Sequence, residues 1–173
     1  MNSPLMNRQS GELESARPEE RVATLKLIAF TLGNLHLALR IESVYKILAR
    51  TPVYGSGINQ IGVTHIGDRE ITVVDLYRQF FKSSQSHESD HHGYLVTLQN
   101  TTGELYGIPV AETPTLMEVA LPMVRVLPES YRCADTLEVA RHVAVIPHDG
   151  VQLTVFLLDV DLLLPIFESP EKG

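Results

Sequence analysis

The sequence predicts an all-β protein built as two small barrels packed side by side. Many short apolar segments alternate in hydrophobicity and are separated by turn residues, a pattern typical of small barrels. The two halves of the chain also resemble each other, since each opens with a hairpin and closes with a hairpin that runs into an Asp and a short apolar helix. A chain of 173 residues divides into two units too small to be robust alone, so we expect a shared core.

The first half begins with a predicted tail and a hairpin. Residues 1–23 are polar, mixed in charge and without periodicity, so we expect a disordered tail that is dispensable for folding. Residues 25–32 and 35–39 alternate in polarity around Gly33-Asn34, which predicts two strands joined by a turn. Residues 40–48 fit a short helix followed by a strand, although the pattern leaves this open, and residues 51–60 are expected to form a loop.

The segment from Gly62 to Phe81 predicts a strand, a tight turn, a strand and a short helix. Gly67-Asp68 supplies the turn, and Gly at the first loop position favours type II′. Asp75 follows the second strand directly, so we expect its carboxylate to cap the helix that spans residues 76–81.

The second half follows a polar linker at residues 82–92 and repeats the pattern of the first half. The predicted subdomains are therefore residues 24–81 and 93–164, with a C-terminal tail at residues 165–173 because Pro165 is expected to end the regular chain. The expected elements are strands at 93–98 and 105–110, short apolar pieces within 113–127, an ambiguous segment at 128–141, strands at 143–147 and 151–158 around an Asp-Gly turn, and a helix at 160–164 after Asp159.

Composition and charge exclude several classes of function. The net charge is −7 and no cluster of Lys and Arg appears, which argues against nucleic acid as a partner. No apolar run is long enough to span a bilayer, and no signal peptide is visible, so we expect a cytoplasmic protein without direct membrane insertion. Cys133 is the only cysteine, so an internal disulfide is impossible.

Three groups of residues could carry chemistry, and each has a simpler interpretation. His87, Glu88, Asp90, His91 and His92 lie close together, but the segment lacks the apolar periodicity that would hold a metal site rigid, so a solvated linker is the better interpretation. Cys133 and His142 lack a predicted oxyanion hole, so we expect no nucleophile there. Asp75 and Asp159 each precede a short helix, which favours capping over a catalytic pair.

Four segments in order resemble the CheW-type coupling proteins of bacterial chemotaxis, over a span from about Leu25 to Leu164. They are LIAFTLGNLHLALRIESVYKIL, GVTHIGDREITVVDL, ELYGIPVAE and FLLDVDLLL. The family's central motif is matched, with its spacing, at Gly62, Val63, Ile66, Val73, Val74, Asp75 and Leu76. The resemblance implies two five-stranded, SH3-like β-barrels joined side by side. It also implies a protein without catalytic activity or cofactor that bridges methyl-accepting chemoreceptors to the histidine kinase CheA.

The chain departs from the family at positions that the family uses for contacts. The family's Arg-Gly turn is here Gly67-Asp68, its strand Pro is Thr72, and its Val-x-Glu-Ile segment has Lys46 in place of the acid. An acid of the second half is replaced by Ala111. These changes favour a dedicated receptor and kinase, such as those that control type IV pili or phototaxis, over a flagellar pathway.

The resemblance implies a partner-binding surface on this chain. Its predicted residues are Val44, Lys46, Ile47, Gly62, Ile66, Gly67 and Asp68. The expected partners are the cytoplasmic tip of a methyl-accepting chemoreceptor and the regulatory domain of a CheA-type kinase, and the protein itself is expected to be a monomer in isolation. The alternative function is a small-ligand- or metal-binding β-barrel domain, supported only by the His-rich linker.

Overall fold

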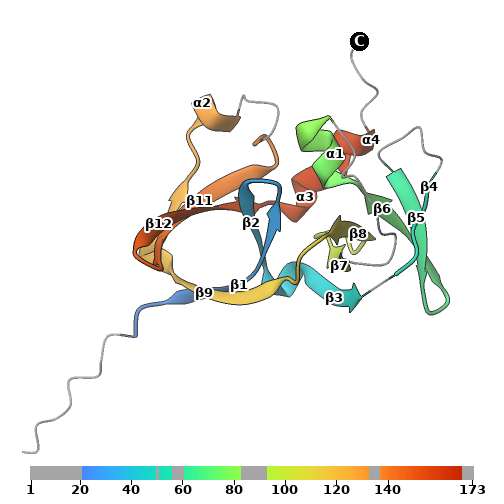
Figure 1. Ribbon diagram of the computed structural model, residues 1–173, viewed down its shortest axis with the longest axis horizontal. Coiled ribbons are helices and arrows are strands. Elements are labelled where there is room, and N and C mark those ends of the chain that lie inside the picture. Colours follow the sequence, from blue (N-terminus) through green and yellow to red (C-terminus); the bar gives the residue numbers. More distant parts are fainter. Residues whose placement is uncertain (1–20, 50, 56–60, 83–92, 133–136, 169–173) are drawn as a thin grey trace, which may run out of the picture.

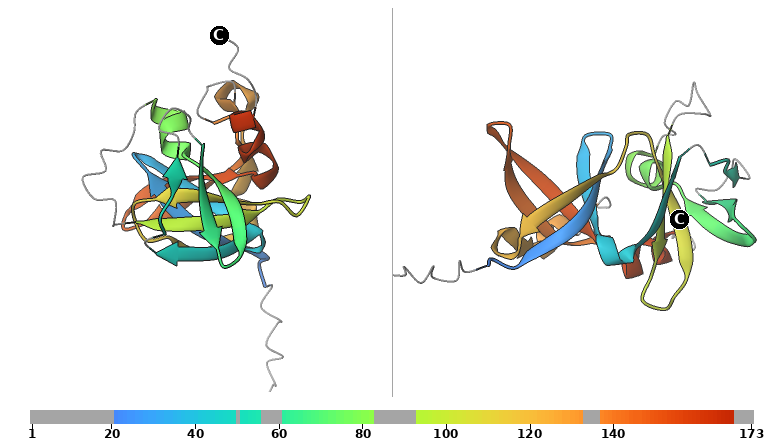
Figure 2. Two further views of the ribbon diagram at one scale, coloured as in Figure 1. Left: turned by 90° about the vertical axis from the view of Figure 1, so that its right-hand side faces the viewer. Right: turned by 90° about the horizontal axis from the view of Figure 1, so that it is seen from below.

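The computed structural model describes residues 21–49, 51–55, 61–82, 93–132 and 137–168. Two curled β-sheets lie side by side, with short helices along one edge of both (Figures 1 and 2). Sheet A contains β1 (Thr24–Leu32), β2 (Leu35–Arg40), β9 (Thr115–Ala120), β10 (Val124–Val126), β11 (Ala140–His148) and β12 (Val151–Leu158). Sheet B contains β3 (Val44–Ala49), β4 (Tyr54–Gly55), β5 (Ile61–Ile66), β6 (Arg69–Val74), β7 (Tyr94–Gln99) and β8 (Leu105–Val110).

The predicted all-β class with two barrel-like units is confirmed. Each sheet has six hydrogen-bonded strands where five were expected. The additional strand in each sheet is a short edge strand, either the two residues of β4 or the three residues of β10. β4 lies within residues 51–60, which were expected to form a loop, because two residues of extended chain are too few to leave an alternating pattern.

The strand orders of the two sheets are related by an internal repeat. Sheet A has the order β10-β11-β12-β2-β1-β9, and sheet B has the order β4-β5-β6-β8-β7-β3. If six is added to the number of each strand in sheet B, the order of sheet A results. In this count β7 and β8 correspond to β1 and β2. Each sheet also contains one equivalent parallel pair, β2 with β12 and β6 with β8. The similarity of the two halves that the sequence predicts is therefore present in the topology.

The two sheets do not coincide with the two halves of the chain, from which the subdomains were predicted. Sheet A combines β1 and β2 from the first half with four strands of the second half, and sheet B combines β7 and β8 with four strands of the first. The chain crosses from one sheet to the other after β2 and again after β8. Repeats and linkers show where similar segments begin, but they do not record which strands pair.

One large core is shared by the sheets, as expected, and each sheet also has one smaller core of its own. The shared core takes Leu39 and Phe30 from sheet A, Val96 and Ile108 from sheet B, and apolar side chains from the helices. The smaller cores are made within sheet A by Leu27, Ala38, Val119, Ala144, Val155 and Leu157, and within sheet B by Ile71, Val73 and Leu95. Because two cores belong to one sheet each and the third to both, neither barrel is complete without the other.

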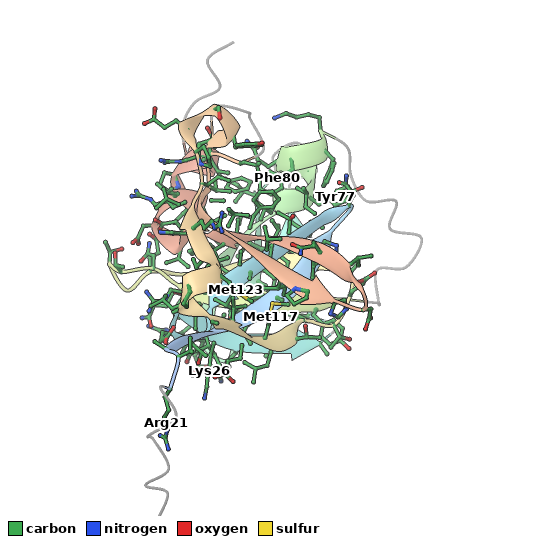
Figure 3. All side chains as sticks on the ribbon, turned by 90° about the vertical axis from the view of Figure 1, so that its left-hand side faces the viewer. Arg21, Lys26, Tyr77, Phe80, Met117 and Met123 are labelled. Atoms are coloured by element: carbon green, nitrogen blue, oxygen red, sulfur yellow. The ribbon has the colours of Figure 1, made fainter. Side chains whose placement is uncertain are left out.

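Short helices follow the closing hairpin of each half and cover the shared core. α1 (Leu76–Phe81) begins at Asp75, whose Oδ1 accepts the backbone N–H of Arg78 at 3.0 Å, so the predicted cap is confirmed. α3 (Val160–Leu163) begins at Asp159, whose carboxylate accepts the N–H of Asp161 at 2.9 Å. Figure 3 views the molecule from the side of sheet A. In this view Tyr77 and Phe80 of α1 lie in the upper part of the molecule, and Met117 and Met123 lie nearer the middle of the molecule.

The remaining connections settle what the sequence left open and correct one boundary. Residues 40–48 form a 3-10 turn, η1 (Ile41–Ser43), followed by β3. A second 3-10 turn, η2 (Leu121–Met123), joins β9 to β10, and α2 (Glu129–Arg132) lies in the ambiguous segment. Regular structure does not end at Pro165, because α4 (Pro165–Glu168) starts there, and Ile166 and Phe167 pack against the shared core. A Pro at the first position of a helix is compatible with helix formation.

Candidate functional site

The predicted contact residues of β3 lie on an exposed edge strand of sheet B. Val44 is half-buried, Lys46 is exposed, and Ile47 retains 39% of its surface. Tyr45 lies between them and is 44% exposed. An aromatic, a basic and an aliphatic side chain thus follow one another on the surface of this strand. Such a combination suits a protein partner, because aromatic and aliphatic side chains supply contact area while a charge supplies selectivity.

β3 is an edge strand and contains a β-bulge. β3 pairs with β7 through Val44 and Leu98, and the next pair is Lys46 with Thr97, so Tyr45 is the extra residue. A bulge disturbs the alternation by which successive side chains point to opposite faces of a sheet. The ammonium group of Lys46 lies 5.5 Å from the centre of the Tyr45 ring, within the range of a cation–π contact.

The second part of the predicted surface is the turn between β5 and β6. Gly67 has φ +59°, Asp68 has no positive φ, and both residues are exposed, which agrees with the predicted type II′ turn. No atom lies within 4 Å of the position that a Cβ on Gly67 would occupy, so the turn projects freely. Ile66 is half-buried and packs against the core of sheet B, so only part of its surface remains for a partner.

Gly62 has a packing role in the structure. It is buried, and a Cβ at this position would meet Val53 Cγ1 at 2.7 Å and the carbonyl oxygen of Tyr54 at 3.2 Å. The absence of a side chain therefore allows β4 to approach β5. Gly62 supports the surface from within and does not contribute to it.

β3 and the β5–β6 turn lie on the same side of sheet B, the lower side in Figure 1, and a second view agrees (Figure 2). Lys46 and Asp68 carry the reversed charges that the sequence singled out, yet no ion pair joins them among the described residues. Next to the turn, His65 Nε2 lies 3.6 Å from Glu70 Oε2 across the hairpin. Lys46 and Asp68 are therefore free to meet charges on a partner.

Sequence reasoning missed two kinds of exposed apolar residue near this surface. The pattern of polarity does not reveal Tyr45, because a bulge leaves no signature in it. Val53 and Tyr54 are 41% and 65% exposed. Val53 directly precedes β4, and Tyr54 is the first residue of this short strand, which was expected to be a loop. The signal in the sequence was two consecutive apolar residues after Pro52, in a segment expected to be a loop.

Neither a candidate metal cluster nor a membrane-spanning helix is found in the described part of the chain. No group of three or more His, Cys, Asp or Glu residues there could hold a metal ion, and no helix there is long and apolar enough to cross a membrane. Cys133 and the His-rich segment at residues 87–92 lie outside the described residues, so their predicted roles stay predictions. Asp159 caps α3 and also forms an ion pair with Arg141, whose Nε lies 2.8 Å from Asp159 Oδ2. Both contacts give its carboxylate a structural role.

Comparisons with known proteins agree with the topology. No protein-family model and no curated sequence matches the chain. Among solved structures, the crystal structure of the scaffolding protein TtCheW from Thermoanaerobacter tengcongensis is similar, with a TM-score of 0.65 and 16% sequence identity. The similarity covers 80% of this chain and 90% of that chain. This chain therefore has the fold of a CheW scaffolding protein.

Proposed function

We propose that this protein is a non-catalytic adaptor in a chemotaxis-type signalling system, which couples the cytoplasmic tip of a methyl-accepting chemoreceptor to the regulatory domain of a CheA-type histidine kinase. The observation that carries the proposal is the surface formed by β3 and the β5–β6 turn, on a fold similar to that of a scaffolding protein. The resemblance of the sequence to coupling proteins points to the same segments. The adaptor would act in the cytoplasm, where both partners expose these domains.

The adaptor holds its two partners in a fixed relation and has no reaction to perform. Its binding energy would come from a few apolar anchors, of which Tyr45 and Ile47 are the most exposed on β3. The charges of Lys46 and Asp68 would set the choice of receptor, because a like charge on the wrong receptor carries a penalty at the interface. Reversal of both signs relative to the family then insulates this adaptor from receptors of a flagellar pathway, and a system controlling pili or phototaxis fits that role.

The test is a double charge reversal, Lys46→Glu with Asp68→Arg. Both side chains are exposed and form no ion pair with each other, so we expect the melting temperature to stay within about 1–2 °C of the parent. Binding to a fragment of the protein's own receptor should weaken, and binding to a flagellar receptor fragment should improve. Isothermal titration with both fragments measures the two affinities.

Reversal of a single charge far from the surface provides the control. Glu138→Lys alters an exposed acid of sheet A's side of the molecule and should leave both affinities unchanged. Equal binding of the parent and the double variant to both fragments would show that Lys46 and Asp68 lie outside the interface. Failure of the parent to bind any receptor or kinase fragment would refute the adaptor function itself.

A further inference from the structure

The bulge in β3 is held by a buried hydroxyl group. Thr97 of β7 is fully buried, and its Oγ1 makes two hydrogen bonds to a single residue of the neighbouring strand. It accepts the backbone N–H of Lys46 at 2.8 Å and donates to the carbonyl oxygen of Lys46 at 2.8 Å. One side chain therefore bonds to both backbone groups of Lys46, the residue that directly follows the bulged Tyr45.

The internal repeat supplies a comparison within the same molecule. Leu98 and Phe30 occupy equivalent places in the two sheets. Each pairs with a residue of the next, antiparallel strand, and that residue has a further partner in a parallel strand. In both sheets this parallel partner lies three positions before the Asp that caps a helix. Thr97 and Ala29, one position earlier, are therefore equivalent. In sheet A, Ala29 pairs with Thr115 in an antiparallel register that runs without a shift along the whole β1–β9 pair. The β1–β9 pairing stops at Ala29, whereas β3 stays paired beyond Thr97, through the bulge, to Leu98.

We propose that Thr97 is a positioning residue for partner binding: its hydroxyl fixes the bulge that presents Tyr45 and Lys46 together on the surface of β3. This inference rests on the proposed function, because it concerns the same surface. Thr97 does not touch the partner, since it has no exposed surface. Its effect passes through Lys46, whose backbone it holds at both polar groups.

The position of Thr97 accounts for the arrangement of the aromatic and basic side chains on this edge strand. In a regular strand, Tyr45 and Lys46 would point to opposite faces. With the bulge, the Lys46 ammonium reaches the Tyr45 ring, and Ile47 is still exposed while Leu48 packs inward against the core of sheet B. A surface that is already in its binding conformation loses less entropy when a partner docks.

The experiment compares two isosteric substitutions that each remove one buried hydroxyl from sheet B. Thr97→Val removes the two hydrogen bonds to Lys46. Thr64→Val is the matched control, because Thr64 is 1% exposed and its Oγ1 donates to the Pro52 carbonyl oxygen at 2.6 Å, away from β3. Both variants should lose stability, whereas only Thr97→Val should raise the dissociation constant for a receptor-tip fragment, by about tenfold. Thr97→Ser keeps the hydroxyl and should bind within about threefold of the parent.

Amide hydrogen exchange in the free protein gives a second measurement that needs no partner. Thr97→Val should speed the exchange of the Lys46 amide selectively, since this N–H loses its acceptor. Parent-like binding by Thr97→Val, or an equal loss of binding by Thr64→Val, would overturn the positioning role. If the parent binds no fragment, the adaptor function fails instead, and exchange alone then decides: unchanged protection of Lys46 in Thr97→Val would also refute the bulge-holding role.

Discussion

Among the described residues, Tyr106 is the largest fully buried side chain, and its hydroxyl links sheet B to the helix that follows β12. It lies on β8 and donates to the backbone oxygen of Val160, the first residue of α3, at 2.7 Å. Burial raises the pKa of Tyr106 far above its ordinary value, and the negative charges of Asp161, Asp159 and Glu104 raise it further. The neutral phenol is therefore the form that the folded protein retains.

This pKa shift predicts how stability changes at alkaline pH. In the unfolded chain Tyr106 ionises near pH 10, while in the folded protein it keeps its proton, so the unfolded state binds fewer protons above that pH. The contribution is complete below about pH 10, and the free energy of unfolding falls as pH rises further. Urea unfolding from pH 8 to 11 should show a steeper decline in the parent than in Tyr106→Phe.

The Phe variant carries a second, constant effect. Removing the hydroxyl leaves the Val160 oxygen without its buried donor, so Tyr106→Phe should be less stable by about 1–2 kcal/mol at pH 7. The two stability curves should therefore converge with increasing pH. Parallel curves would mean that Tyr106 ionises in the folded protein as readily as in the unfolded chain.

At the scale of elements, the turn between β1 and β2 shows how a helix and a hairpin depend on each other. Gly33 has φ +57°, and a Cβ at this position would lie 2.8 Å from Phe81 Cζ of α1. Phe81 is itself in contact with Tyr77, with ring centres 4.6 Å apart. Gly33 therefore meets two requirements: a positive φ, and the absence of a side chain where Phe81 at the end of α1 covers the turn.

Alanine substitutions at two glycines separate these requirements. Gly67 has nearly the same φ, +59°, but nothing lies within 4 Å of its Cβ position. Gly67→Ala should cost only backbone strain, about 1–2 kcal/mol. Gly33→Ala should cost that plus the displacement of Phe81, roughly 1 kcal/mol more. Chemical denaturation measures both, and equal losses would show that the Phe81 ring moves aside freely.

The elements were largely predictable because they depend on local patterns. Alternating polarity located β1, β2, β5, β6 and β12, and the Asp that follows a strand located the starts of α1 and α3. Residues 40–48 stayed ambiguous because a 3-10 turn that runs into a bulged strand imitates helical spacing. The bulge also hid Tyr45, since it depends on a hydroxyl 51 positions later in the chain. Local patterns carry no trace of such distant partners.

At the scale of the whole molecule, the exchange of strands between halves was invisible to the sequence. Each half contains strands for four-sixths of one sheet and two-sixths of the other, and its apolar faces look the same whichever way they pair. The shared core, in contrast, could be expected from size alone. A second link between α3 and sheet B is Asp161, which accepts hydrogen bonds from the backbone and hydroxyl of Thr101 at 3.0 and 2.8 Å.

Strand exchange predicts that the two halves cannot fold separately. Fragments of residues 1–82 and 93–173 should each lack a cooperative unfolding transition, because each would leave both sheets incomplete. Co-expressed, they should associate one to one and recover the far-UV circular dichroism spectrum of the parent. A single fragment that unfolds cooperatively as a monomer would contradict this, and a parent cut by a protease at an engineered site in the linker is the control.

The parallel pairing of β2 with β12 also sets a timetable for synthesis on the ribosome. β2 ends at residue 40, and β12 begins at residue 151. At a typical rate of about 5–20 residues per second, the completed β1–β2 hairpin waits roughly 5–20 s for the strand that covers its open side. Through that interval an apolar hairpin with a free edge is exposed in the cell, so the nascent chain is most vulnerable to aggregation and most in need of a chaperone before β12 is made.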